Sequence, residues 1–81
     1  MSKRMELNST DQPALENLHV VFEVFKHRNI LIQEIYIYCD MMSDWIDITE
    51  LMLSNKKFME KLTDILDDHL INLEFERLAS F

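Results

Sequence analysis

The chain has 81 residues, of which 48% are hydrophobic and 28% charged, and its formal net charge is −7. A chain of this length forms one small domain with a marginal core, because it buries only about 60% of the surface that its unfolded form exposes. The acidic balance repels phosphate groups and argues against direct nucleic-acid binding, and no apolar run approaches the roughly 20 residues that cross a membrane.

Glycine is absent and proline occurs once, at Pro13. Domains rich in β-strands normally use glycine in hairpin turns and bulges, so this composition favours helices. The first ten residues, MSKRMELNST, are mostly polar. They are expected to form a disordered N-terminal arm, residues 1–10, ahead of a single helical domain, residues 11–81.

A first long helix is predicted to begin near Asp11 and Pro13. Aspartate accepts hydrogen bonds from the free amides of a first helical turn, and proline lacks the amide that would stay unpaired there. At about 100° per residue, the apolar side chains that follow fall on one face, as in a helix that packs on a core. That face comprises Leu15, Leu18, Val21, Phe22 and Phe25.

A β-hairpin is the alternative for residues 19–38. The segments HVVFEVF and ILIQEIYIY are rich in β-branched and aromatic residues, and KHRN between them has the length of a turn. However, KHRN contains neither glycine nor an Asn-Gly or Asp-Gly pair, and a two-stranded ribbon is only marginally stable by itself. The helix is therefore preferred, and the hairpin stays open.

The segment NILIQEIYIYCDMM, residues 29–42, is apolar on two sides if the helix continues through it. A helix that is apolar nearly all round must be buried on several sides. Only one other long helix is available to cover it, so contact with a second copy of the chain is the simpler explanation and a homodimer is predicted. The two apolar stripes are Ile32, Tyr36 and Cys39 on one side and Ile30, Ile37 and Met41 on the other.

Ser43 and Asp44 are expected to cap a short helix from Asp44 to Leu53, which Ser54 and Asn55 separate from a last amphipathic helix. The predicted fold class is all-α: a small helical bundle of two long antiparallel helices joined by a short helix and completed by dimerisation. The apolar face of the last helix comprises Phe58, Met59, Leu62, Ile65, Leu66, Leu70 and Leu73.

No group of residues identifies a reaction or a cofactor. The carboxylates of residues 40–50 lack the spacing of a calcium loop or a Glu-x-x-His motif, and His69 lies within the apolar face of the last helix, so no metal site is predicted. A helical metal site around residues 64–69 is the alternative from the enzyme class, which metal analysis of the purified protein tests. Cys39 lies in the most apolar segment, where a thiol stays protonated, and no histidine is near it in sequence to act as a base. We therefore expect no enzymatic activity. The single cysteine and the lack of a charged-then-apolar opening segment favour a cytoplasmic location.

Aromatic and methionine side chains gather between residues 36 and 52, and these residue types are enriched at protein interfaces. With the acidic charge, they predict a small acidic regulator or adaptor that acts through helix-mediated contacts with a protein partner that has a basic surface. The alternative is an acidic nucleic-acid mimic that blocks a DNA- or RNA-binding protein, and salt dependence separates the two. The expected partner-binding residues are Ile30, Ile37, Tyr38, Met41, Asp44, Trp45 and Asp47.

Overall fold

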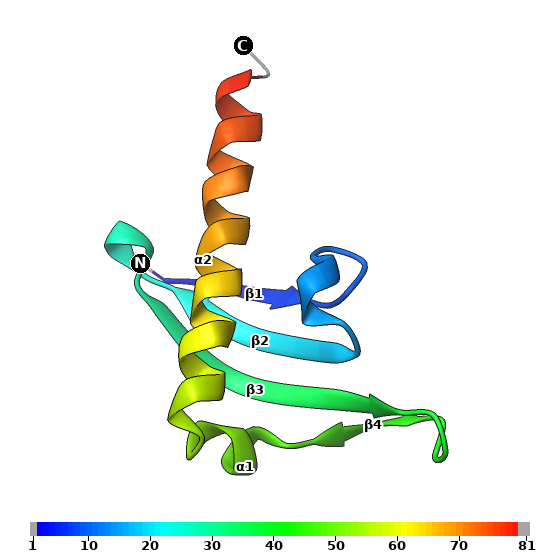
Figure 1. The fold of residues 1–81 in the computed structure, drawn as a ribbon. Helices are drawn as coiled ribbons and strands as arrows, with labels where there is room; N and C mark the ends of the chain where they lie inside the picture. Colours follow the sequence, from blue (N-terminus) through cyan, green and yellow to red (C-terminus); the bar gives the residue numbers. More distant parts are fainter. Residues whose placement is uncertain (1, 80–81) are drawn as a thin grey trace.

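The computed structural model describes the backbone of residues 2–79 and the side chains of residues 2–27 and 29–74. It has two layers (Figure 1): a sheet of antiparallel strands in the order β1-β2-β3-β4, and a long helix that crosses one face of the sheet. The elements in chain order are β1 (Lys3–Leu7), the 3₁₀ turn η1 (Pro13–Leu15), β2 (Leu18–Val24), the 3₁₀ turn η2 (Lys26–Arg28), β3 (Ile30–Cys39), β4 (Asp44–Asp47), α1 (Thr49–Leu53) and α2 (Lys56–Ala79).

The all-α helical bundle predicted from the composition is wrong. Strands β2 and β3 occupy the segment that was assigned to the first long helix, and they pair with each other antiparallel. The hairpin alternative is therefore the correct interpretation of residues 19–38. Its turn needs no glycine, because His27 adopts a left-handed conformation with φ 61° and ψ 30°, which histidine enters more readily than most side chains.

Two flanking strands and a helix stabilise the hairpin, which would be only marginally stable by itself. Strand β1 lies within residues 1–10, the expected disordered arm, and instead pairs with β2, for example through Met5 and Phe22. Strand β4 pairs with β3 and replaces the first half of the expected short helix, so only Thr49–Leu53 is helical there. Four strands covered by a helix are stable where a two-stranded ribbon is marginal.

The core lies between the sheet and α2. Ile35 from β3 and Leu62 and Leu66 from α2 are at most 2% exposed. The amphipathic pattern predicted a helix over this last segment, and the structure confirms it. The side-chain oxygen of Asn55 accepts a hydrogen bond from the backbone N–H of Phe58 at 3.1 Å, which satisfies one free amide at the start of α2. Within residues 2–79, neither helix has the length and apolar character that spanning a bilayer requires.

A β-bulge in β3 explains why the apolar residues of this strand have the spacing that is typical of a helix. Ile32 and Glu34 pair with consecutive residues of β2, so Gln33 is an extra residue in β3. As a result Ile32 and Ile35 both belong to the core, although they are three positions apart. Regular strand alternation would place them on opposite faces, whereas a spacing of three is typical of one face of a helix.

The two-layer packing also removes the reason for expecting a second copy of the chain. Ile30 packs against the core, and Ile37 lines a groove beside Phe58 and Leu62 of α2. Two of the three residues of the second apolar stripe, Ile30 and Ile37, therefore have neighbours within the same chain, whereas Met41 is 97% exposed. The homodimer stays a prediction, which light scattering over a dilution series tests.

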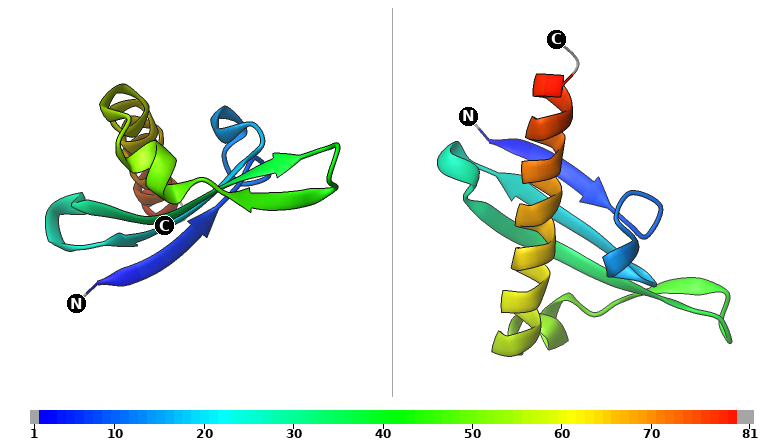
Figure 2. Two further views of the ribbon diagram at one scale, coloured as in Figure 1. Left: turned by 90° about the horizontal axis from the view of Figure 1, so that it is seen from below. Right: turned by 45° about the horizontal axis from the view of Figure 1, so that its top comes forward.

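The other face of the sheet is uncovered (Figure 2). In the left view, α1, α2 and the β1–β2 connection lie on one side of the sheet, and the opposite side is open. Alternate residues of each strand point to opposite faces, so the neighbours of core residues point to this open side. We call this surface the open face.

Candidate functional site

The open face carries a cluster of four aromatic side chains from three adjacent strands. His19 of β2 pairs with Tyr36 of β3, and Tyr38 of β3 pairs with Trp45 of β4. The ring centroids are 6.1 Å apart for His19 and Tyr36, 5.8 Å for His19 and Trp45, and 5.3 Å for Tyr38 and Trp45. The rings therefore form one continuous surface, which we call the aromatic cluster.

The aromatic cluster is accessible to a ligand. Trp45 is 43% exposed and Tyr38 36% exposed. A pocket with a volume of about 390 Å³ lies against the cluster and is lined by Asn8, His19, Tyr36 and Trp45. Aromatic rings with polar tips at an open pocket provide a large contact area and fixed hydrogen-bonding groups.

Carboxylates from three strands surround the aromatic cluster. His19 Nε2 lies 3.4 Å from Oε1 of Glu6, which belongs to β1. The hydroxyl of Tyr36 donates a hydrogen bond to Oε1 of Glu34 at 2.6 Å. Asp47 pairs with Tyr36 across β3 and β4. The same surface thus combines apolar area with negative charge.

These contacts shift two pKa values in opposite directions. The hydrogen bond to Glu34 raises the pKa of the Tyr36 phenol, with further contributions from burial and from the negative charges of Glu34 and Asp47. Hydrogen bonds from Thr49 lower the pKa of the Asp47 carboxyl, because the hydroxyl donates to Asp47 Oδ1 at 2.5 Å and the backbone N–H donates at 2.9 Å. Asp47 is therefore ionised, and Tyr36 neutral, at neutral pH.

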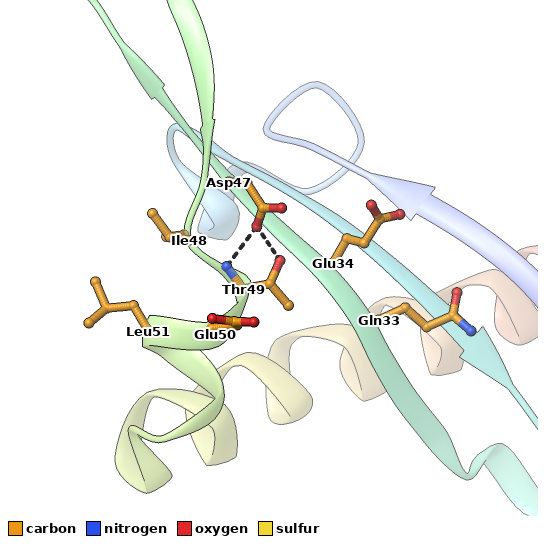
Figure 3. Close-up of a pocket in the computed structure, with 7 residues that line it drawn as sticks. All are labelled: Gln33, Glu34, Asp47, Ile48, Thr49, Glu50 and Leu51. Carbon is orange, nitrogen blue, oxygen red and sulfur yellow. Dashed lines mark hydrogen bonds between the residues drawn. The ribbon is translucent and has the colours of Figure 1, made fainter.

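A second hollow of about 610 Å³ adjoins the cluster where β4 leads into α1 (Figure 3). Glu34 and Asp47 line this hollow, so the two carboxylates connect it to the aromatic cluster. Among the described side chains, no three His, Cys, Asp or Glu groups are placed to hold a metal ion. The other lining residues are Gln33, Ile48, Thr49, Glu50 and Leu51.

The structure separates the seven residues that the sequence suggested for partner binding. Three of them, Tyr38, Trp45 and Asp47, come together on the open face, whereas Ile30 and Ile37 lie on the side of α2. The role of all seven residues in partner binding stays a prediction. Met41, in the turn after β3, is 97% exposed, and Asp44 accepts a hydrogen bond from the backbone N–H of Trp45 at 2.7 Å.

Sequence reasoning missed four members of this surface: Glu6, His19, Glu34 and Tyr36. Tyr36 was assigned to an apolar stripe of the expected helix, and the other three were not singled out. The alternation in LHVVFEV and in IYIY is the signal that could have found two of them, because period-two spacing separates His19 and Tyr36 from the apolar residues on either side of each.

Comparison of the chain with protein-family models, with curated proteins and with solved structures gives no match. The class of protein is therefore described from the fold and the site alone. It is a mixed α and β two-layer domain in which a helix fills one face of an antiparallel sheet, and the open face presents an aromatic cluster surrounded by carboxylates.

Proposed function

We propose that the chain is a protein-binding domain, a small acidic regulator or adaptor, and that its open face is the surface that contacts the partner. The observation that supports this proposal is the exposed pair of Trp45 and Tyr38, packed edge to face at 5.3 Å on a sheet face that no helix covers. Tryptophan and tyrosine are enriched among the residues that contribute most to binding energy at protein interfaces.

The arrangement differs from the helix-mediated contact expected from the sequence. The part of the apolar stripe of α2 that contains Leu62 and Leu66 is buried against the sheet, so this part of the helix is not free for a partner, although Leu73 further along is 40% exposed. The open face instead offers rings in a fixed arrangement on three paired strands. A preformed surface loses little conformational entropy when it binds.

A pull-down with matched variants tests the proposal. The double variant Tyr38→Ala/Trp45→Ala removes two exposed rings from the open face, and Leu53→Ala/Leu73→Ala removes two similarly exposed side chains elsewhere. We expect a protein captured by the wild-type chain from a lysate of its source cells to be lost with the first variant and retained with the second. Equal capture by both variants, each shown by circular dichroism to be folded, contradicts the proposal.

The acidic nucleic-acid mimic is the alternative, and its interface would consist mainly of carboxylates. Such a complex weakens steeply with salt, because exposed charge pairs more than about 8 Å apart are screened at physiological ionic strength. An interface centred on Trp45 and Tyr38 tolerates salt better, because burial of apolar area persists. Partner affinity measured over a salt series therefore distinguishes the two functions.

A further inference from the structure

We propose that the open face binds an arginine side chain from a basic segment of the partner protein, seated in the pocket between Trp45, Tyr36 and His19. This inference rests on the proposed protein-binding function and adds the chemical group that is recognised. The pocket has a volume of about 390 Å³, and Asn8 contributes its remaining wall.

The walls of the pocket suit a planar cation. The ring of His19 is tilted by 60° to that of Trp45 and by 50° to that of Tyr36, so none of these pairs is stacked face to face. His19, Tyr36 and Trp45 all line the pocket, and Trp45 is 43% exposed, so these rings are accessible to a ligand there. A guanidinium group stacks on such faces and is attracted to the ring electrons within about 6 Å of the centroid.

Negative charge stands beside the rings. Glu6 is hydrogen-bonded to His19, Glu34 to Tyr36, and Asp47 lies opposite Tyr36 in the neighbouring strand. An ionised carboxylate has about four acceptor sites, so each of these groups retains capacity for a further donor. The pocket is lined by Asn8, His19, Tyr36 and Trp45, and two of these walls, His19 and Tyr36, are hydrogen-bonded to carboxylates beyond the lining. A cation that enters the pocket therefore meets aromatic rings directly, with negative charge behind two of them.

The open face already contains one arginine–carboxylate contact of its own. Nη2 of Arg4 lies 3.6 Å from Oε2 of Glu34, the carboxylate whose other oxygen accepts the Tyr36 hydroxyl. The carboxylates of Glu6, Glu34 and Asp47 outnumber this guanidinium, so these four described side chains give this part of the open face a net negative charge. Charge complementarity therefore favours a basic occupant and disfavours an acidic one.

Arginine fits these walls better than lysine does. Its five N–H donors are fixed in a plane, so it can stack on Trp45 and donate to a neighbouring carboxylate at the same time. A lysine ammonium is compact and strongly hydrated, and it lacks the flat surface that stacking requires. We therefore expect the site to discriminate between two side chains of equal charge.

Trp45 is the only tryptophan in the chain, so its fluorescence reports directly on the pocket. The purified full chain is titrated with acetylated tetra-arginine, tetra-lysine and tetra-citrulline peptides at about 0.15 M salt, where exposed charges are screened beyond about 8 Å. Citrulline keeps the shape of arginine without its charge. We expect saturable fluorescence changes with tetra-arginine, binding at least threefold weaker with tetra-lysine, and no binding with tetra-citrulline.

Matched double variants separate the site from general attraction to an acidic protein. Glu6→Gln/Asp47→Asn and Glu60→Gln/Asp64→Asn raise the net charge by the same amount, but Glu60 and Asp64 are exposed positions on α2. We expect about a tenfold loss of tetra-arginine affinity with the first pair of substitutions and little change with the second. Because these variants lack the fluorescent tryptophan, the affinity of Trp45→Ala and Trp45→Phe for tetra-arginine is measured by calorimetry. We expect this affinity to be lost in the alanine variant and partly retained in the phenylalanine variant.

Two results would overturn the arginine site. One is equal affinity for tetra-arginine and tetra-lysine with equal losses in both double variants, which is the behaviour of general charge attraction. The other is an absence of tetra-arginine binding while Tyr38→Ala/Trp45→Ala still abolishes capture of the partner. The second result leaves the protein-binding function standing and removes only the arginine, so failure of this inference is distinguishable from failure of the proposed function.

Discussion

The backbone N–H of Ile35 donates a hydrogen bond to Oγ1 of Thr49 at 2.9 Å, at the point where the pairing of β3 with β4 ends. Beside it, the backbone N–H of Ile48 donates to the carbonyl of Ile35, also at 2.9 Å. A side-chain hydroxyl thus takes the place of a backbone acceptor and continues the ladder for one more step. The same hydroxyl donates to Asp47, so one residue joins the sheet to the start of α1.

Thr49→Val should destabilise the protein. Valine keeps the shape of threonine but removes both the acceptor for the Ile35 N–H and the donor to Asp47. Leaving a largely buried donor without a partner costs about 1–3 kcal/mol in free energy of unfolding, measured by urea denaturation. Thr49→Ser keeps the hydroxyl and should lose much less.

Thr63→Val provides a matched control for that measurement. The Thr63 hydroxyl is exposed and donates only to the carbonyl of Met59, one turn earlier in the same helix, at 2.8 Å. Removing it should change the free energy of unfolding by no more than about 0.5 kcal/mol. Equal losses at both positions would show that Thr49 has no special part in joining sheet and helix.

Leu66→Ala tests the packing of α2 on the sheet. Leu66 is 0% exposed, and its truncation leaves a cavity in the only core between the described layers. We expect a loss of about 2–5 kcal/mol in free energy of unfolding, which is large for a domain of this size. Leu51→Ala, at a position that is 65% exposed, should cost far less in the same denaturation experiment.

Tyr36 should titrate above the ordinary phenol pKa of 10.0. The chain has two tyrosines, so Tyr38→Phe leaves Tyr36 as the single phenol in an ultraviolet absorbance titration. Because the folded-state pKa is raised, the stabilisation from this hydroxyl is complete below the ordinary pKa and is lost as the pH rises through the folded value. Adding Glu34→Gln should move the midpoint back toward 10.0, and an unchanged midpoint would show that Glu34 does not cause the shift.

Asp47 should contribute to stability at neutral pH and lose that contribution in acid. Its folded-state pKa is lowered, so the unfolded chain binds more protons through the acidic range, and stability rises with pH there. The contribution is complete above the ordinary aspartate pKa and disappears as the pH falls through the folded value. Urea denaturation at a series of acidic pH values should show a shallower pH dependence for Asp47→Asn than for the wild type.

The sequence by itself determined that the last segment is a helix, because its apolar residues recur at helical spacing, and the structure places this helix at Lys56–Ala79. Tyr38, Trp45 and Asp47 were three of the seven residues that the sequence suggested for partner binding. The structure places these three on one face of the sheet, while their role in binding stays a prediction. The sequence could not place His19 beside Trp45, because that contact joins positions 26 residues apart through the pairing of three strands.

Only the tertiary structure decided between helix and hairpin for residues 19–38. The bulge at Gln33 gives Ile32 and Ile35 a helix-like spacing, and His27 makes the turn without the glycine that a hairpin normally signals. The local sequence of residues 19–38 therefore did not clearly distinguish a helix from a hairpin. The hairpin is stabilised over the helix by the pairing of β1 and β4 with its two edges and by the packing of α2 on one face. These interactions form only when residues distant in the sequence meet.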